Sequence, residues 1–271
     1  MNIKRMVKAV ALGLVLASSA AVSSAATINV GGVVFDPASP FDFLAKGGIF
    51  ERVIREAGDT AEGFGIINSI NENQDATQFC PSCELTFTFS GFRLTDPNPQ
   101  ALLFDGGIVN FYVQDKTAAG YTAYDATRPQ GNAGDGTLWL TAAGHTDVRF
   151  GYSGPGTLFG KIDSGTLGSG TERGQGGGLL DVTGGLAATF LNTNGERDSF
   201  GQFADLNFTT TFLPTQEAAI AAGAPPLTGN ATFTGNSVNA VPEPATLLLL
   251  GAGLAGLGFT GKRRKAAVVA A

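Results

Sequence analysis

The chain has two cysteines, Cys80 and Cys83, in the sequence Cys-Pro-Ser-Cys. A redox-active pair with this spacing is expected to open a helix after a strand, but this pair precedes a strand-like segment over 84–94. A haem attachment site would need histidine at position 84, where the chain has glutamate. In an oxidising compartment such a pair forms a local disulfide. We therefore predict a Cys80–Cys83 disulfide, with a reduced pair or a redox or metal site as the alternatives.

His145 is the single histidine of the chain and the one candidate for a histidine base. A serine triad would need a nucleophile motif, and Gly-Tyr-Ser-Gly-Pro at 151–155 lacks the final glycine. A phosphate loop over 156–161 has Pro155 in place of its first glycine and Ile162 in place of serine or threonine. We predict that His145 is a turn residue, with a functional role as the alternative, and we assign no catalytic residue.

The acidic and aromatic side chains give weaker signals. Many pairs of acids could serve glycoside cleavage, but no pair is distinguished by its context. Asp59 and Asp96 could bind calcium in loops, although the spaced aspartates of a calcium-binding loop are absent. Trp139 and the four tyrosines could form a sugar-stacking platform, yet 20 of the 25 aromatic residues are Phe, which favours core packing. We predict no metal ion and no cofactor.

The elements that must position these residues are β-strands. The 39 glycines disfavour a mostly helical chain. Apolar and polar residues alternate over 85–90, 109–114 and 205–212, and such strands are expected to pack in two sheets. We therefore predict an all-β fold, a jelly-roll-like β-sandwich over residues 27–240. Further strands are predicted over 28–35, 64–70, 137–141, 148–152, 179–191 and 231–238, and short helices over 49–57 and 216–222.

The region 27–240 is strongly acidic. It contains 10 basic and 22 acidic residues, which give it a formal charge of −12. A surface of this sign repels nucleic acids and anionic lipids. Nucleic acid is therefore excluded from the predicted partners.

The first 25 residues have the layout of a secretory signal peptide. A positive start is followed by nine uncharged residues over 9–17, and Ser23 and Ala25 stand where signal peptidase expects small residues. Nine residues are too few to span a bilayer. We predict that residues 1–25 are removed by signal peptidase, with a membrane anchor or a buried helix as the alternative. The positive start consists of Lys4, Arg5 and Lys8.

A second apolar segment, over 245–260, has no charged residue. As a helix it would be about 24 Å long, which is short for a bilayer but tolerable with local thinning. Basic residues tend to stay cytoplasmic, so the preceding domain is expected on the far side of the inner membrane. We predict a single C-terminal transmembrane helix with a basic stop. This stop is formed by Lys262, Arg263, Arg264 and Lys265.

Pro242, Glu243 and Pro244 stand just before this helix. The two prolines keep the peptide extended and accessible to a processing enzyme. Together with the apolar helix and the basic cluster, residues 241–265 resemble the PEP-CTERM sorting signal of Gram-negative bacteria. The resemblance implies that a membrane-embedded exosortase cuts near the Pro-Glu-Pro after transient inner-membrane insertion. It also implies that the passenger reaches the cell surface or the extracellular matrix.

These observations predict a non-enzymatic, exported structural protein associated with an exopolysaccharide or biofilm matrix. Extracellular polysaccharide is its candidate partner beside signal peptidase and exosortase. The alternatives are a carbohydrate-binding surface module and, after it, a surface glycosidase. Exposed coplanar Trp and Tyr side chains would favour binding, and two carboxyl groups ~5–10 Å apart in a cleft would favour hydrolysis.

Overall fold

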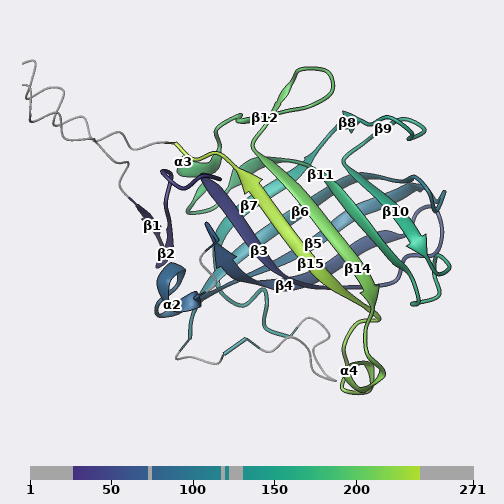
Figure 1. The fold of residues 1–271 in the computed structure, drawn as a ribbon, viewed down its shortest axis with the longest axis horizontal. Helices are drawn as coiled ribbons and strands as arrows, with labels where there is room; N and C mark the ends of the chain where they lie inside the picture. Colours follow the sequence, from purple (N-terminus) through teal and green to yellow (C-terminus); the bar gives the residue numbers. More distant parts are fainter. Residues whose placement is uncertain (1–26, 73–74, 117–119, 122–130, 239–271) are drawn as a thin grey trace, which may run out of the picture. The chain divides into compact units, whose positions relative to one another are not determined.

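The computed structural model describes residues 27–72, 75–116, 120–121 and 131–238. Within them one long antiparallel sheet forms the body of the fold (Figure 1). The all-β prediction is therefore confirmed. The strands of this sheet are β3 (Phe43–Glu51), β4 (Thr60–Ile70), β5 (Cys83–Asp96), β6 (Leu102–Asp115), β7 (Thr137–His145), β10 (Leu158–Ser164), β11 (Arg173–Gly184), β14 (Leu206–Pro214) and β15 (Leu227–Gly235).

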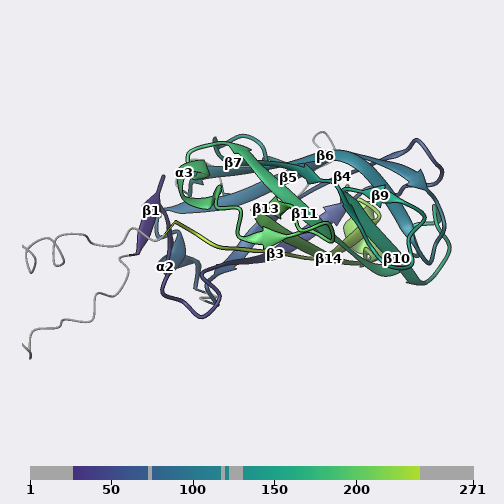
Figure 2. The same cartoon turned by 90° about the horizontal axis from the view of Figure 1, so that it is seen from above.

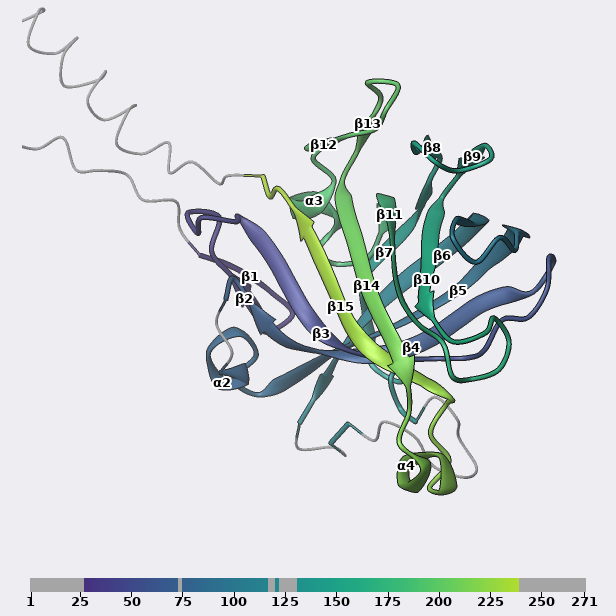
Figure 3. The same cartoon turned by 45° about the vertical axis from the view of Figure 1, so that its right-hand side comes forward.

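The sheet closes into a barrel of eight strand positions. Its first and last strands, β3 and β15, lie side by side (Figures 1 and 3). Between them, the Thr228 hydroxyl donates to the Ile49 carbonyl at 3.0 Å. On the other side, β7 and β10 share one position between β6 and β11. Strand β10 pairs with residues 102–104 of β6, and β7 pairs with residues 108–113.

The structure does not have the predicted sandwich of two separate sheets. Strands β5 and β6 are 14 residues long, and their pairing shifts register between Leu94 and Asp96. Such irregularities bend and twist a strand, which allows one sheet to curl onto itself. In Figure 2 the wall of β5, β6 and β7 lies opposite the wall of β3 and β14. Strands with one apolar face can bury that face inside a barrel as well as between the two sheets of a sandwich, so the alternation pattern is compatible with both folds.

Phenylalanine rings fill the interior of the barrel. The ring of Phe233 contacts Phe111 edge-on and stacks on Phe208, with both centroid separations 4.8 Å. Glycine makes room for these rings on β4: a Cβ at Gly65 would come within 2.5 Å of Cζ of Phe87 and would clash with the carbonyl of Gly48. Glycine at such a position therefore leaves the space that a neighbouring phenylalanine ring occupies.

Short elements decorate the barrel. The predicted helix over 216–222 is confirmed as α4. The helix predicted over 49–57 is wrong, because Ile49 and Phe50 pair with β4 and the Phe50 ring stacks on Phe64. The predicted strand 179–191 ends at Gly184. The short elements are β1 (Ile28–Val30), β2 (Val33–Phe35), α2 (Ala76–Phe79), β8 (Asp147–Val148), β9 (Pro155–Gly156), α3 (Ala188–Leu191), β12 (Glu196–Arg197), β13 (Phe203–Ala204) and α4 (Glu217–Ala221).

The structure describes neither end of the chain. The predicted signal peptide and the predicted helix over 245–260 lie outside the described residues. Among the residues that are described, none of the helices has the length and apolarity needed to cross a membrane.

Candidate functional site

Cys80 and Cys83 form the disulfide predicted from the sequence. The bond links the end of α2 to the start of β5, and both residues are buried. The Cys80 carbonyl accepts hydrogen bonds from the Cys83 N–H at 3.3 Å and from Nζ of Lys116 at 3.1 Å. This geometry fastens a strand start to its preceding turn, which is a structural role.

His145 is the last residue of β7, so its assignment to a turn was wrong. The ring is buried between two carboxylates. Its Nδ1 lies 2.9 Å from both oxygens of Asp181 on β11, and its Nε2 lies 3.3 Å from Oδ2 of Asp198. Burial lowers the pKa of His145, but the hydrogen bonds and charges of the two aspartates outweigh it and raise this pKa above its usual value.

In the part of the chain that the structure describes, the cluster around His145 contains no nucleophile placed for catalysis. The nearby Ser199 hydroxyl donates to the Val148 carbonyl at 2.6 Å, and the Ser199 N–H donates to Asp147 at 2.9 Å. The other oxygen of Asp198 accepts the N–H groups of Phe200 at 2.9 Å and of Gln202 at 2.6 Å. These contacts fasten the loop between β12 and β13 to the barrel. We therefore assign His145 a positioning role in the fold.

The other sequence candidates also have structural partners. Trp139 is fully buried and donates from Nε1 to the Val30 carbonyl at 2.9 Å, so it is inaccessible to a sugar ring. Asp59 accepts the N–H of Arg55 at 2.7 Å, and Asp96 accepts that of Asn98 at 3.0 Å, so each carboxylate closes its own turn. In the part of the chain that the structure describes, no group of three His, Cys, Asp or Glu residues is arranged to hold a metal ion.

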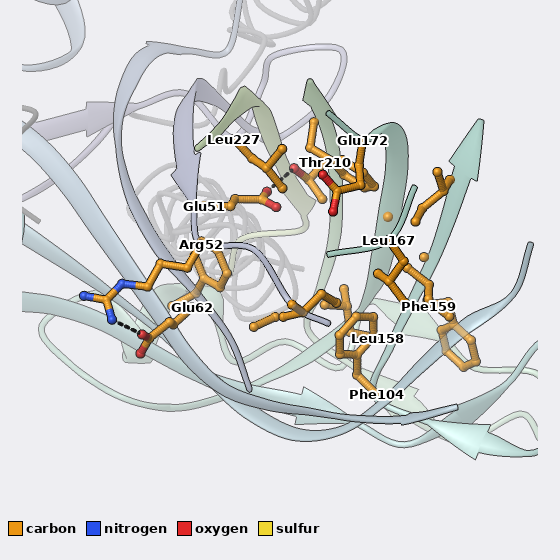
Figure 4. A pocket seen from close by; sticks show the side chains of 18 of the residues that line it. Glu51, Arg52, Glu62, Phe104, Leu158, Phe159, Leu167, Glu172, Thr210 and Leu227 are labelled. Carbon is orange, nitrogen blue, oxygen red and sulfur yellow. Dashed lines mark hydrogen bonds and ion pairs between the residues drawn. The ribbon is translucent and has the colours of Figure 1, made fainter. Parts of the chain in front are cut away.

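The barrel contains a cavity of about 60 Å³, which is open at one end of the barrel. Figure 4 shows that Glu51, from the end of β3, and Glu172, from just before β11, enter it together with Thr210 of β14. The remainder of the wall is largely apolar. Its apolar side chains include Phe89, Phe104, Leu158, Ile162, Leu167 and Leu227.

Glu51 lies in surroundings that disfavour its charge. Burial raises its pKa to about 7, against a smaller opposing effect of the hydrogen bond from Thr210. That hydrogen bond joins Oγ1 of Thr210 to Oε1 of Glu51 at 3.3 Å. The Glu51 carboxyl group is therefore close to half protonated at neutral pH.

Glu172 is almost completely buried, with 2% of its surface exposed. Its Oε1 accepts the N–H groups of Gly168 at 2.5 Å and of Ser169 at 3.1 Å. Its Oε2 is buried and has no hydrogen-bond partner among the described residues. A carboxylate oxygen left without a donor in an apolar wall is costly, so this atom marks the cavity as a candidate binding site.

The size of the cavity limits what it can do. An apolar cavity of about 150 Å³ holds a benzene molecule, and this one is less than half as large. A pyranose ring does not fit between the two carboxyl groups, although their side chains face one another. At the entrance, Arg52 and Glu62 form an exposed ion pair with a separation of 2.8 Å.

Sequence reasoning missed both glutamates. Glu51 fell in the segment 49–57 that was assigned to a helix. A strand assignment would have placed it on the same face as Ile49, which is buried. Glu172 lies in a glycine-rich connection and gives no local signal.

The remaining predicted site residues lie outside the described part of the chain. These are Pro242, Glu243 and Pro244, and the basic cluster Lys262, Arg263, Arg264 and Lys265.

Comparison with known families finds one match, to the PEP-CTERM protein-sorting motif, over residues 240–265. It covers the segment in which the Pro-Glu-Pro, the apolar run and the basic cluster follow one another. Neither a curated protein nor a solved structure is significantly similar to the chain. The motif implies export with a sorting tail of the membrane-anchor type and processing by an exosortase.

Proposed function

We propose that this PEP-CTERM protein is delivered to the cell surface or the extracellular matrix of a Gram-negative bacterium, where its barrel has a structural role. The observation that carries the proposal is the sorting motif over residues 240–265. In the proposed pathway, signal peptidase removes residues 1–25 and the C-terminal helix holds the chain briefly in the inner membrane. Exosortase then cuts near Pro242–Pro244 and frees the barrel for its destination.

The barrel has features that suit an extracellular structural protein. The Cys80–Cys83 disulfide is compatible with an oxidising compartment. His145 holds a loop through Asp198, and the nearby Ser199 hydroxyl is engaged with the Val148 carbonyl. The acidic region 27–240 favours solubility and disfavours adhesion to anionic surfaces. A non-catalytic role is therefore the proposal that we prefer.

The two alternative functions receive less support. A carbohydrate-binding module of the expected kind would present exposed coplanar Trp and Tyr rings, but Trp139 is in the core, and the exposed rings include those of Phe41, Phe150, Phe200 and Phe203. A glycosidase would need two carboxyl groups around a sugar, and the cavity that contains Glu51 and Glu172 is too small for one. Binding of matrix polysaccharide elsewhere on the barrel belongs to the proposal as a candidate interaction. A glycan-binding screen would test it.

The decisive experiment concerns processing. Replacing Pro242, Glu243 and Pro244 together by Ala should leave an uncut precursor in the inner membrane, because the enzyme loses its extended recognition peptide. A matched control replaces Pro225 and Pro226, which lie in the loop between α4 and β15, by Ala. The control protein should be exported and cut like the parent. Mass spectrometry of the C-terminus provides the measurement, and surface-located parent protein that still carries residues 247–264 would refute the proposal.

A further inference from the structure

We propose that the barrel cavity binds the ammonium group of a small alkylamine between Glu51 and Glu172. The amine would enter with its charged end first and lay its carbon chain along the apolar wall. This site is independent of the sorting motif and of the proposed export route. The proposal assigns a class of ligand to the cavity, which the proposed structural role does not explain.

The first argument is the unpartnered oxygen of Glu172. Its Oε1 is occupied by two backbone donors, whereas Oε2 has none among the described residues. In Figure 4 the Glu172 carboxyl group points into the cavity, toward that of Glu51. A buried acceptor in this position is satisfied by a donor that comes from outside the chain. An ammonium group carries three donors and can serve both carboxyl groups at once.

The second argument is charge. Among the described residues that line the cavity, Arg52 is the one basic side chain, and its guanidinium pairs with Glu62. The Thr210 hydroxyl is uncharged and has two acceptors, Oε1 of Glu51 at 3.3 Å and the Thr211 carbonyl at 3.4 Å. The lining residues from β5, β6, β10, β14 and β15 carry no charge. The site therefore attracts a cation and repels carboxylates and phosphates.

The third argument is the shape and chemistry of the wall. The apolar side chains of Phe104, Leu158 and Leu227 suit methylene groups, and the volume of about 60 Å³ suits an ammonium group with a few carbons. A calcium ion would need six to eight oxygen ligands, which the apolar wall does not supply. A longer amine could extend through the opening past Arg52 and Glu62.

The test uses the protein as the cell exports it, titrated calorimetrically with n-butylammonium. The amine should bind saturably at pH 8 and more weakly, by about tenfold, at pH 6, because protonation of Glu51 removes its negative charge. n-Butanol and butyrate, which have a similar carbon chain, are the ligand controls. Neither should bind measurably in the range where the amine saturates the site.

Two variants separate the role of the carboxylate from that of the space. Glu172→Gln should weaken amine binding by about tenfold or more, since it removes a charge-assisted hydrogen bond. Gly160→Ala retains both carboxyl groups but adds a methyl group that would contact Leu102 and Phe104 at 3.4–3.6 Å, so it should also weaken binding by occupying the cavity. The matched control is Glu217→Gln on the exposed helix α4, outside the lining of the cavity, which should change the affinity by less than about twofold.

The proposal has clear refuting results. Equal binding of n-butanol and n-butylammonium would show an apolar hollow in which the carboxylates have no role. Absence of saturable binding up to roughly 10 mM amine would show that the two carboxyl groups do not form an ammonium site. An affinity that Gly160→Ala leaves unchanged would place any bound amine elsewhere on the acidic surface. None of these results would affect the processing experiment, so the two proposals fail separately.

Discussion

Replacing Glu51 by Gln should stabilise the barrel at alkaline pH. The carboxyl group of Glu51 has a pKa of about 7 in the folded chain, and burial is the main cause of the increase. In the unfolded chain the value returns to 4.5. Gln is nearly the same size, is neutral at every pH, and presents a carbonyl oxygen to the hydroxyl of Thr210. The substitution therefore removes the cost of burying a charge and changes little else.

The size of this effect follows from the difference between the two pKa values. Above pH 7 the folded chain must bury a charged carboxylate that prefers water. The difference of about 2.5 pKa units corresponds to roughly 3 kcal/mol of destabilisation. Between pH 4.5 and 7 the folded chain binds more protons than the unfolded chain, so the stability of the parent protein falls as pH rises through this range. Below pH 4.5 both states are protonated, and the cost disappears.

Urea unfolding of the parent and of Glu51→Gln at pH 4.5 and pH 8.5 measures this effect. The variant should gain roughly 3 kcal/mol relative to the parent at pH 8.5 and close to nothing at pH 4.5. Glu217→Gln, on the exposed helix α4, removes a carboxylate that is not buried and serves as the control. A gain that is equal at both pH values, or a loss at pH 8.5, would refute the assignment of Glu51 as a half-buried acid whose surroundings disfavour its charge.

Three further substitutions test the packing and the clamps. His145→Asn should lower the free energy of unfolding at pH 5.5 and lower it much less at pH 9. The raised pKa of His145 means that its protonated form stabilises the fold below about pH 6.5, and this contribution is lost as pH rises through the folded pKa. An equal loss in urea unfolding at both pH values would argue against this explanation. Replacing Cys80 and Cys83 together by Ser should lower the free energy of unfolding by roughly 2 kcal/mol. Intact-mass measurement before and after reduction should reveal the disulfide in the parent protein. Two free thiols in exported protein would contradict the disulfide. Gly65→Ala should lower the free energy of unfolding by about 1–3 kcal/mol or more, because the added Cβ clashes with Phe87. Gly154→Ala, with no atom within 4 Å of the added Cβ, should be tolerated. Similar thermal midpoints for the two variants would contradict the packing argument.

The sequence was sufficient to predict the strand content of the fold but not the way in which its sheet closes. Alternation over 85–90 and 109–114 correctly placed Phe87 and Phe111 on one buried face. Alternation determines which side of a strand is buried, but it does not determine which strand becomes its neighbour. The contact of β15 with β3 joins segments nearly 180 residues apart, and no local pattern reports it.

The error at 49–57 has a specific cause. Charged residues around Ile49 and Ile54 gave the segment a helical pattern, but the first part of it extends β3. The pairing of Phe50 with Phe64, and the stacking of their rings at 5.6 Å, stabilise the strand. Tertiary contacts outweighed a weak local preference. Because Glu51 lay within this segment, the same error concealed the cavity.

The partners of His145 were equally hidden from sequence reasoning. Asp181 and Asp198 lie 36 and 53 residues further along the chain. The local sequence Gly-His-Thr-Asp resembles a turn, and only the pairing of β7 with β11 brings the Asp181 carboxylate to the ring. His145 is opposite Leu179 in this register, and Asp181 is its diagonal neighbour two residues further along β11, so the contact is recognised only once the register is known.

The buried and half-buried acids of this barrel differ in how completely their oxygens are satisfied, and this difference separates structural acids from the candidate ligand site. Asp205 accepts three backbone N–H groups, from Val182, Thr193 and Asn194, each at 2.7 Å. Those bonds hold the connection around α3 against β11 and leave no demand for an outside donor. Glu51 has one side-chain donor, and Glu172 has an oxygen with none among the described residues. Selection for stability alone would favour glutamine or an apolar residue at position 51, so a Glu51→Gln variant that is more stable but binds n-butylammonium about tenfold more weakly would indicate that Glu51 is used for amine binding.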